Sequence, residues 1–164
     1  YMIGSINTKY GKLRYKNGRK KPYELQTIFI GNEMFGGWQI GHTDPITYAN
    51  KYNSFVKELK KLNKKLRFIA VGACSDHFGH WNEYVLKNIK EKIDELSVHY
   101  YSIRTEKDKK HPDYKTRYIP TVAAATEVRL MLDRTIREIK KYSNKNIKIA
   151  FDCLLYTSDA ADDC

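Results

Sequence analysis

The stretch that decides the fold class is Ile28-Phe29-Ile30-Gly31-Asn32-Glu33-Met34. It begins as a short apolar run, partly β-branched, and stops abruptly at a glycine followed by Asn-Glu. Such a run is typical of a buried strand rather than a helix. Because catalytic groups of α/β barrels follow the carboxyl ends of strands, Glu33 is a candidate active-site carboxylate. For the Asn-Glu pair taken by itself, the alternative is a surface role in which Glu33 caps a loop or pairs with a lysine.

The rest of the chain alternates predicted helices and strands. Asp44 before Pro45 predicts a helix start, and this helix should end near Asn63. Its apolar stripe comprises Tyr48, Tyr52, Phe55, Val56, Leu59 and Leu62. A second helix is predicted from the spacing of Trp81, Val85, Ile89 and Ile93, a third covers 122–142, and strands are predicted at 66–73, 95–99 and 146–151. This alternation predicts right-handed βαβ units in a parallel sheet, and strand counting fits an open doubly wound sheet as well as a barrel.

A longer motif surrounds Glu33, because a glycine-rich turn and then Trp38-Gln39-Ile40-Gly41-His42 follow it. Residues 30–42 resemble the acid/base region of family 51 glycoside hydrolases, the retaining α-L-arabinofuranosidases. Residues 10–23 resemble the loop before that strand, 96–101 the sixth-strand motif, and 149–152 the start of the seventh strand. The resemblance covers roughly residues 8–152 and selects the barrel. It implies a partial (β/α)8 TIM barrel that holds about strands 4 to 7.

The resemblance also implies roles for individual side chains. Glu33 matches the acid/base, and Asn32 matches the asparagine that hydrogen-bonds the sugar 2-hydroxyl. His99 and Tyr101 match residues around the bound sugar and the nucleophile, and Trp38 is expected to line the cleft. Ordinary packing is the alternative for these three residues when each is considered separately. The implied activity is exo-acting release of terminal arabinofuranose from arabinose-containing oligosaccharides or polysaccharides.

The main departure from the family is at Cys153, where the nucleophilic glutamate is expected after Phe-Asp. A retaining glycosidase needs two carboxyl groups about 5 to 5.5 Å apart, and a thiol is a poor substitute. Asp152 comes one residue early and is predicted to point to the opposite face of its strand. For Glu33 we expect a pKa raised by a partly apolar setting and by the nearby nucleophile. This chain is therefore expected to be inactive. A second departure is Tyr100, where many members have glutamine.

The length and the two ends predict a fragment. A (β/α)8 barrel takes about 250 residues, whereas this chain has 164. We interpret 1–152 as a partial catalytic domain and 153–164 as a non-native tail, which resembles translated sequencing-adapter read-through and contains no lysine or arginine. A signal peptide is not visible, so a cytoplasmic location is expected, with secretion left open because the true N-terminus is expected to be missing. A half barrel should expose strand edges and self-associate.

The net charge of +11 raises nucleic-acid binding as a competing function. The lysines of the first long helix lie opposite its apolar stripe, as on a solvated face, and no RNA- or DNA-binding motif accompanies them. Another clan A glycosidase, such as an endoglucanase or xylosidase, is the closer alternative, because it shares the Asn-Glu pair. The continuation after Glu33 favours the arabinofuranosidase.

No cofactor, metal, nucleic-acid or membrane partner is predicted. The spacing of Cys74, Cys153 and Cys164 fits neither a disulfide framework nor a zinc site, and His77 with His80 lacks a third ligand of matching spacing. The charged segment 104–120 is predicted to be the loop after strand six, either shaping the cleft or simply solvated. The resemblance implies a homo-oligomer for the intact protein.

Overall fold

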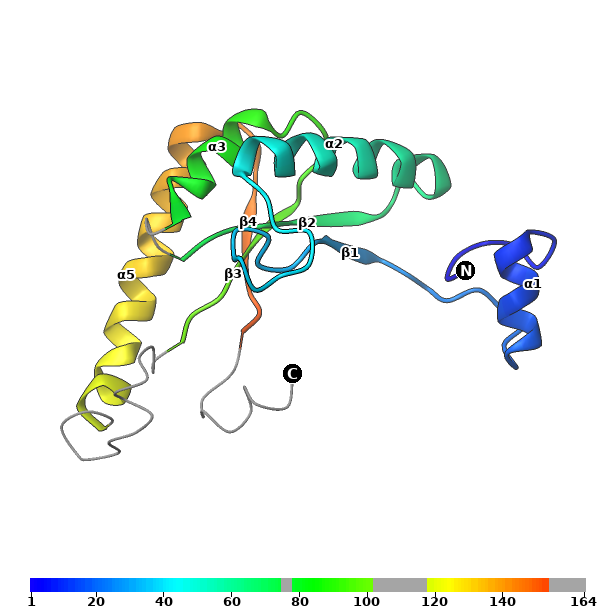
Figure 1. Cartoon of the computed structure of the whole chain (residues 1–164), viewed down its shortest axis with the longest axis horizontal. Helices are drawn as coiled ribbons and strands as arrows, with labels where there is room; N and C mark the ends of the chain where they lie inside the picture. The colour runs from blue at the N-terminus through cyan, green and yellow to red at the C-terminus, as the bar shows by residue number, and fades with distance from the viewer. Residues whose placement is uncertain (75–77, 102–117, 154–164) are drawn as a thin grey trace.

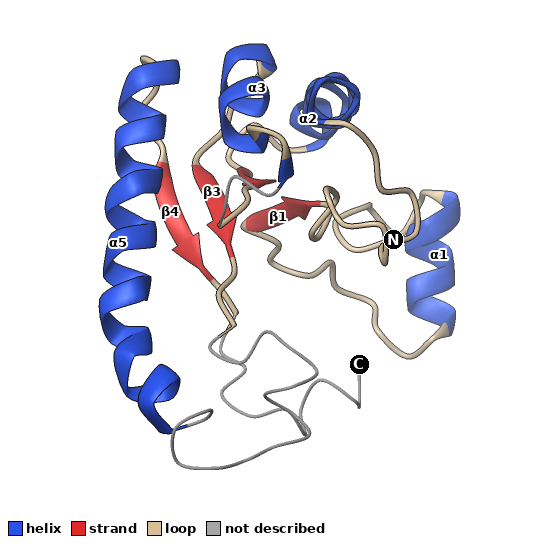
Figure 2. Cartoon of the chain, turned by 60° about the vertical axis from the view of Figure 1, so that its left-hand side comes forward, coloured by secondary structure: helices blue, strands red, loops and turns tan. Residues whose placement is uncertain are grey.

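The computed structural model of the chain describes residues 1–74, 78–101 and 118–153. Within these residues four strands form one parallel sheet in chain order: β1 (Thr27–Ile30), β2 (Arg67–Val71), β3 (Glu95–Val98) and β4 (Lys148–Phe151). The helices are α1 (Lys9–Lys16), α2 (Pro45–Leu62), α3 (Trp81–Asn88) and α5 (Ile119–Tyr142). Figures 1 and 2 show α2, α3 and α5 on one side of the sheet and α1 apart from them beyond β1. The predicted parallel α/β order is confirmed.

The core lies between the sheet and these three helices. The register aligns Ile30 with Ala70, Ala70 with Leu96, and Leu96 with Ile149. This row belongs to one apolar cluster with the inner faces of α2 and α3, which contribute Tyr48, Ala49, Tyr52, Val56, Trp81, Val85 and Leu86. Because side chains alternate across a strand, the neighbours of this row face away from the helices. The aligned register also brings the carboxyl ends of all four strands to the same edge.

Helix α2 follows the prediction at both ends. The Asp44 carboxylate accepts hydrogen bonds from the backbone N–H groups of Ile46 and Thr47, at 3.0 and 2.9 Å, and so satisfies the open first turn. The predicted apolar stripe is too wide, since Phe55 and Leu62 are 58% and 68% exposed. Buried Tyr48 instead gives the helix a polar link to the sheet.

The Tyr48 hydroxyl connects α2 to the carboxyl ends of two strands. It donates to the Ile30 carbonyl at 2.7 Å and accepts from the Val71 N–H at 2.8 Å. Burial raises the pKa of this hydroxyl far above its usual range, so it stays neutral and can act as donor and acceptor together. The connection fixes the point at which β1 turns into the loop that carries Glu33.

Two segments differ from the sequence prediction. Residues 10–14, expected in a loop, lie in α1, which Thr8 caps through a 3.1 Å bond from the Gly11 N–H. The second predicted helix stops at Asn88, so buried Ile93 lies outside it. The stop has a polar cause, because Asn53 of α2 accepts hydrogen bonds from the N–H groups of Lys90 and Glu91.

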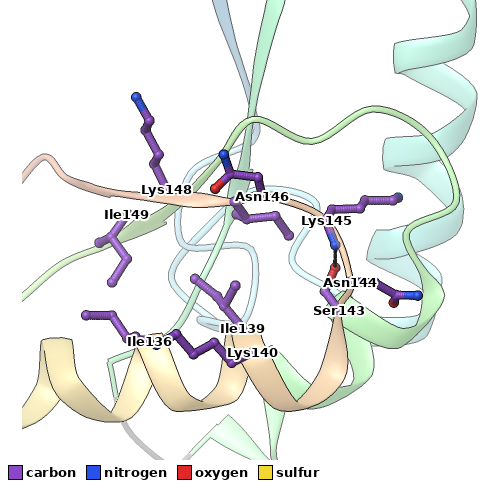
Figure 3. Close-up of a pocket in the computed structure, with 10 residues that line it drawn as sticks. Ile136, Ile139, Lys140, Ser143, Asn144, Lys145, Asn146, Lys148 and Ile149 are labelled. Atoms are coloured by element: carbon purple, nitrogen blue, oxygen red, sulfur yellow. Dashed lines mark hydrogen bonds between the residues drawn. The ribbon is translucent and has the colours of Figure 1, made fainter.

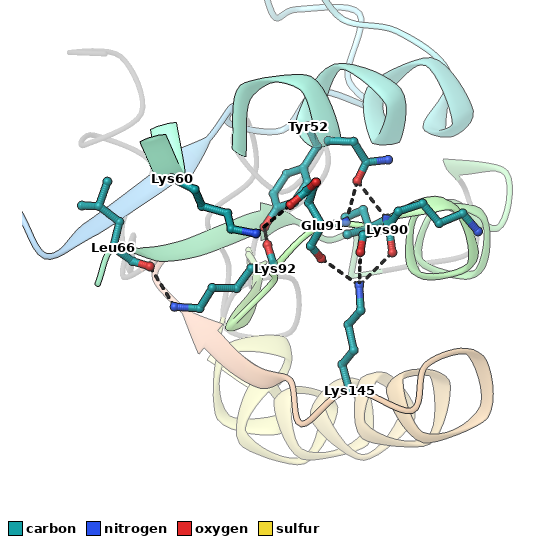
Figure 4. A network of polar contacts seen from close by, with 9 residues as sticks. Tyr52, Lys60, Leu66, Lys90, Glu91, Lys92 and Lys145 are labelled. Atoms are coloured by element: carbon teal, nitrogen blue, oxygen red, sulfur yellow. Dashed lines mark hydrogen bonds and ion pairs between the residues drawn. The ribbon is translucent and has the colours of Figure 1, made fainter. Parts of the chain in front are cut away.

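Lys145 stabilises the same turn from the other side. Its ammonium donates to the carbonyl oxygens of Ile89, Lys90 and Glu91 at 2.9, 3.2 and 2.8 Å (Figure 4). Nearby, the Tyr52 hydroxyl donates to the Lys92 carbonyl. These contacts join the loop after α3 to α2 and to the loop before β4.

The basic residues of α2 are partly paired. Lys60 contacts Glu91 at 3.0 Å, and Lys61 contacts Glu58 at 2.7 Å.

Across the described ranges, none of the helices combines the length and the apolar character needed to cross a membrane. Of the predicted loop 104–120, residues 104–117 lie outside the described residues, and residues 119–120 belong to α5 instead of a loop.

Candidate active site

A cluster of ionisable side chains lies at the carboxyl edge of the sheet. Glu33 follows β1, His99 and Tyr101 follow β3, and Asp152 follows β4. Ser97, within β3, shares a face with His99 and Tyr101 because every second residue of an extended chain points the same way. The intervening residue Tyr100 is 7% exposed and packs with Val98 and Met131 on the opposite face.

The backbone at Glu33 has an unusual conformation. Its φ of 44° is left-handed, which costs a residue with a β-carbon about 1 kcal/mol. The Glu33 carbonyl accepts from the Gly36 N–H at 2.8 Å, which closes the turn. A β-carbon on Gly36 would lie 2.3 Å from the Trp38 ring, so glycine is required there for the indole to reach Glu33. Strained residues of this kind are often found at functional sites.

Both oxygens of the Glu33 carboxylate have a partner. The Trp38 indole N–H donates to Oε2 at 2.7 Å, and Nδ1 of His99 lies 2.8 Å from Oε1. The carboxylate side chain is 12% exposed and that of His99 is 17% exposed. The hydrogen bond with His99, reinforced by those with Trp38 and Tyr101, lowers the pKa of Glu33 below its usual value despite partial burial.

The expected rise in the Glu33 pKa is therefore wrong for this chain. That expectation rested on a partly apolar setting and on a second carboxylate beside Glu33. Burial does act to raise the pKa, but position 153 holds a cysteine. With donors on both oxygens, the environment favours the anion, which is the form that acts as a base. To serve as an acid, Glu33 would have to lose one donor or gain a proton along the contact with His99.

His99 lies between two carboxylates. Its Nε2 is 3.3 Å from Oδ1 of Asp152, while its Nδ1 faces Glu33. The hydrogen bond with Glu33 raises the pKa of His99, with a further contribution from the charge of Asp152, and together they outweigh partial burial. Because both ring nitrogens face acceptors, the doubly protonated ring is the favoured form.

Asp152 does not point away from the site, so that prediction is wrong. The register explains this, because Ala150 pairs with Ser97 and Asp152, two residues further along, points to the same face. The Ser97 hydroxyl lies 2.9 and 3.1 Å from the two oxygens of its carboxylate. Ser97 carries no predicted role, although its position two residues before His99 is a signal that it shares the His99 face.

The other predicted site residues are placed as follows. Trp38 is 64% exposed and lies edge-on to Phe35 and Phe78, so it is a surface aromatic in contact with the carboxylate. Tyr101 is hydrogen-bonded to Glu33 and Cys153, and burial with these neighbours raises its pKa. Cys153 is buried beside it. Asn32 is exposed, and within the described residues no contact joins it to the cluster.

The described residues contain no group of three or more His, Cys, Asp or Glu side chains arranged to hold a metal ion. His80 is exposed just before α3, and His77 of the predicted pair lies outside the described residues. A hollow of about 560 Å³ lies between the end of α5 and the start of β4 (Figure 3). It is at the amino end of β4, away from Glu33, and its ten lining residues include no carboxylate.

The fold and the cluster together define a parallel α/β protein with a carboxylate, an imidazole and a phenol at the carboxyl edge of its sheet. A sequence profile of the alpha-L-arabinofuranosidase 1 domain matches residues 1–119, which include Glu33, Trp38, His99 and Tyr101. The chain therefore belongs to the α-L-arabinofuranosidases of glycoside hydrolase family 51.

Individual relatives agree with this assignment. The chain is 30% identical to the intracellular exo-alpha-(1->5)-L-arabinofuranosidase 1 of Bacillus subtilis, with 93% of this chain and 31% of that protein covered. It is 29% identical to the Bifidobacterium longum enzyme of the corresponding name, with coverages of 93% and 28%. The crystal structure of an arabinose complex of alpha-L-arabinofuranosidase from Thermotoga maritima matches with a TM-score of 0.72 and 31% identity, covering 89% of this chain and 28% of that one. The chain thus spans about a third of the length of these relatives.

Proposed function

We propose that residues 1–152 are the part of a (β/α)8 catalytic domain that carries the acid/base of a retaining, exo-acting α-L-arabinofuranosidase. The observation that carries the proposal is the Glu33 carboxylate, held by His99 and Trp38 at the carboxyl edge of a parallel sheet, inside the segment that matches the family. The substrate class is arabinose-containing oligosaccharides or polysaccharides, as the names of the relatives suggest. A location inside the cell follows by the same analogy.

In this proposal Glu33 protonates the leaving oxygen and later removes a proton from water. Tyr101 and His99 face the bound sugar, Asn32 binds its 2-hydroxyl, and Trp38 forms a wall of the cleft. The two halves of the cycle need the two protonation states of Glu33. The contact with His99 stabilises the ionised form of Glu33, and the charge of a nucleophile at position 153 would stabilise the protonated form.

We further propose that the nucleophile is missing because residues 153–164 are not native to the protein. Cys153 occupies the position of the expected glutamate, so the chain as it stands should not turn over an aryl arabinofuranoside. Sequencing the coding DNA across codon 153 tests this directly. A Glu-Trp pair after Asp152 in a continuing frame would establish the tail as foreign, and the completed protein should then release arabinose. A genuine Cys153 codon followed by the same tail would contradict the proposal about the tail.

Sugar binding can be tested on the chain itself with its two tryptophans. The Trp38 indole N–H donates to Glu33, whereas the Trp81 indole N–H is buried and donates to the Val71 carbonyl at 2.9 Å. In ¹⁵N-labelled protein, a methyl α-L-arabinofuranoside should shift the Trp38 indole signal and leave that of Trp81 in place. Trp81 therefore serves as the internal reference.

The same titration with a xylopyranoside and a glucopyranoside separates the arabinofuranosidase from other clan A glycosidases. A response limited to the arabinofuranoside supports the proposal. A stronger response to either pyranoside would favour the xylosidase or endoglucanase alternative. No movement of the Trp38 signal with any sugar would contradict a binding role for this edge of the sheet.

A further inference from the structure

Asp152 has no role in the reaction proposed above, but its position suggests one. Its carboxylate approaches Nε2 of His99 from the end of β4, while Nδ1 of the same ring contacts Glu33 from the loop after β1. Ser97 places its hydroxyl against both Asp152 oxygens, and Ser97 is 8% exposed. The imidazole is thereby fixed from both sides, and its two nitrogens have different partners.

The protons carried by Glu33, His99 and Asp152 in each ionisation state show how this arrangement works. When Glu33 is ionised, His99 carries protons on both nitrogens and donates to both carboxylates. When Glu33 is protonated and donates to Nδ1, His99 is neutral and its remaining proton is on Nε2, where Asp152 accepts it. In both states Nε2 is protonated, and the two states differ by one proton that lies either on Nδ1 or on Oε1 of Glu33.

We propose that Asp152, oriented by Ser97, is a positioning residue that fixes His99 in the Nε2-protonated form, so that Glu33 exchanges its acid/base proton along the Nδ1–Oε1 contact. The role of Glu33 in this inference rests on the proposed function. A carboxylate that fixes the tautomer of a histidine through one nitrogen, while the other nitrogen works, is a common device in catalytic and metal sites.

The groups that bear on His99 are few among the described residues. Glu33 and Asp152 contact it directly, from the ends of β1 and β4, and the Ser97 hydroxyl lies 3.5 Å from its Nε2. Tyr101 and Cys153 are further along, since Tyr101 bonds to Glu33 and Cys153 bonds to Tyr101. The raised pKa of His99 agrees with the geometry, because both neighbouring carboxylates contribute to it.

The test is ¹⁵N NMR of the His99 ring in the full chain, which reports the protonated nitrogen and the titration midpoint together. In Glu33→Gln, whose neutral amide stands in for the protonated carboxyl, Nδ1 can face a donor, so neutral His99 should carry its proton on Nε2. Asp152→Asn keeps an acceptor but removes the charge, so the midpoint should fall by about one pH unit while the tautomer is retained. Asp152→Ala in the same Glu33→Gln background leaves Nε2 only the Ser97 hydroxyl at 3.5 Å, so neutral His99 should change to the Nδ1-protonated tautomer, which donates to the side-chain amide oxygen at position 33.

Two further variants control for indirect effects. Asp133→Asn removes the same charge on α5, where the carboxylate faces Arg129, and should leave His99 unchanged. Ser97→Ala keeps Asp152 but removes its hydroxyl partner, and should lower the midpoint less than Asp152→Asn does. It also provides a second reading if the Asp152 variants fail to fold.

The outcomes separate this inference from the proposed function. A neutral His99 protonated on Nδ1 in Glu33→Gln, or a midpoint that stays fixed in both Asp152→Asn and Ser97→Ala, would overturn the positioning role. The measurement needs neither substrate nor turnover. If the tautomer depends on Asp152 while no arabinofuranoside binds, the proposed function fails and the proton relay through His99 stands.

Discussion

At the scale of single residues, the charge of Glu33 is stabilised by specific donors rather than by exposure to water. Trp38 and His99 each donate to a different carboxylate oxygen, and the side chains of Glu33 and His99 are both largely buried. Hydrogen bonds to an ionised partner are stronger than neutral ones. The two donors should therefore have separable effects. The contact with His99 should show in the pH dependence of stability, and the hydrogen bond from Trp38 should show in the Glu33 pKa.

His99→Gln tests the charged contact through the pH dependence of stability. The raised pKa of His99 means that its contribution is complete below the ordinary value of 6.5 and is lost as the pH rises through the folded value. The lowered pKa of Glu33 means that its contribution is present above 4.5 and is lost as the pH falls through the folded value. The two contributions coincide between pH 4.5 and 6.5.

In that window His99→Gln should lower the free energy of unfolding by about 1 kcal/mol, with a smaller loss above it. Urea denaturation over a pH series measures this. The control is His42→Gln, a change at an exposed histidine, for which we expect only a small effect. A His99→Gln loss that is the same at every pH would contradict an ionic contact.

Trp38→Phe removes the indole donor and keeps an aromatic ring against the Phe35–Phe78 pair. The Glu33 pKa should rise, because one stabilising hydrogen bond to the anion is lost. Since Trp38 is 64% exposed, the stability should change by no more than about 0.5 kcal/mol. Carboxyl ¹³C NMR of Glu33 measures the pKa. Trp81→Phe is the matched control. It should show the reverse pattern, lowering the free energy of unfolding by about 1 to 3 kcal/mol and leaving the Glu33 pKa unchanged.

The same residues show how far the sequence could predict the site. Glu33, His99 and Tyr101 were placed together because parallel strands bring their carboxyl ends to one edge. The direction of the Glu33 pKa was predicted wrongly, because it depends on which donors reach two particular oxygens. Asp152 was predicted wrongly because its face is set by the pairing of Ala150 with Ser97, and that register leaves no signal in the sequence.

At the scale of elements, the loop after α3 depends on one lysine from a distant segment. Lys145 donates to three consecutive carbonyl oxygens, those of residues 89–91, and partial burial lowers its pKa. Those carbonyls follow the helix end, where intrahelical partners are missing. Lys145 thus performs for this loop what a capping residue performs for a helix.

Lys145→Met should lower the free energy of unfolding by about 1 to 2 kcal/mol, because the carbonyls lose their donor and methionine keeps most of the chain length. Lys140→Met, at an exposed position of α5, is the control and should stay within about 0.5 kcal/mol of the parent. Thermal and urea unfolding measure both. Equal losses in the two variants would show that the contacts of Lys145 contribute nothing specific.

Element boundaries followed the sequence where a local signal determined them. Asp44 before Pro45 fixed the start of α2, because its carboxylate satisfies two open N–H groups. The end of α3 did not follow its apolar spacing, since Asn53 and Lys145 hold the next residues in a turn and both are far away in sequence. Long-range polar contacts of this kind leave no periodic signal along the chain.

At the scale of the whole molecule, the described sheet has helices on one side only. Phe29 alternates with the core residue Ile30, so it lies on the side away from these helices, and it is 49% exposed. β1 and β4 each have one neighbour among the described strands, so each presents an unpaired edge. Exposed strand edges and apolar faces favour association between copies. We therefore expect the chain to self-associate as its concentration rises.

Two lysine substitutions locate the surface responsible. Phe29→Lys places a charge on the open face of the sheet and should weaken association, as seen by sedimentation velocity over a range of concentrations. Phe55→Lys makes the same change at a similarly exposed phenylalanine on α2, at 58%, and should leave association unchanged. A chain that stays monomeric at every concentration would contradict the expectation. Equal weakening by both variants would move the contact to the helical side, because only the sheet surface distinguishes Phe29 from Phe55.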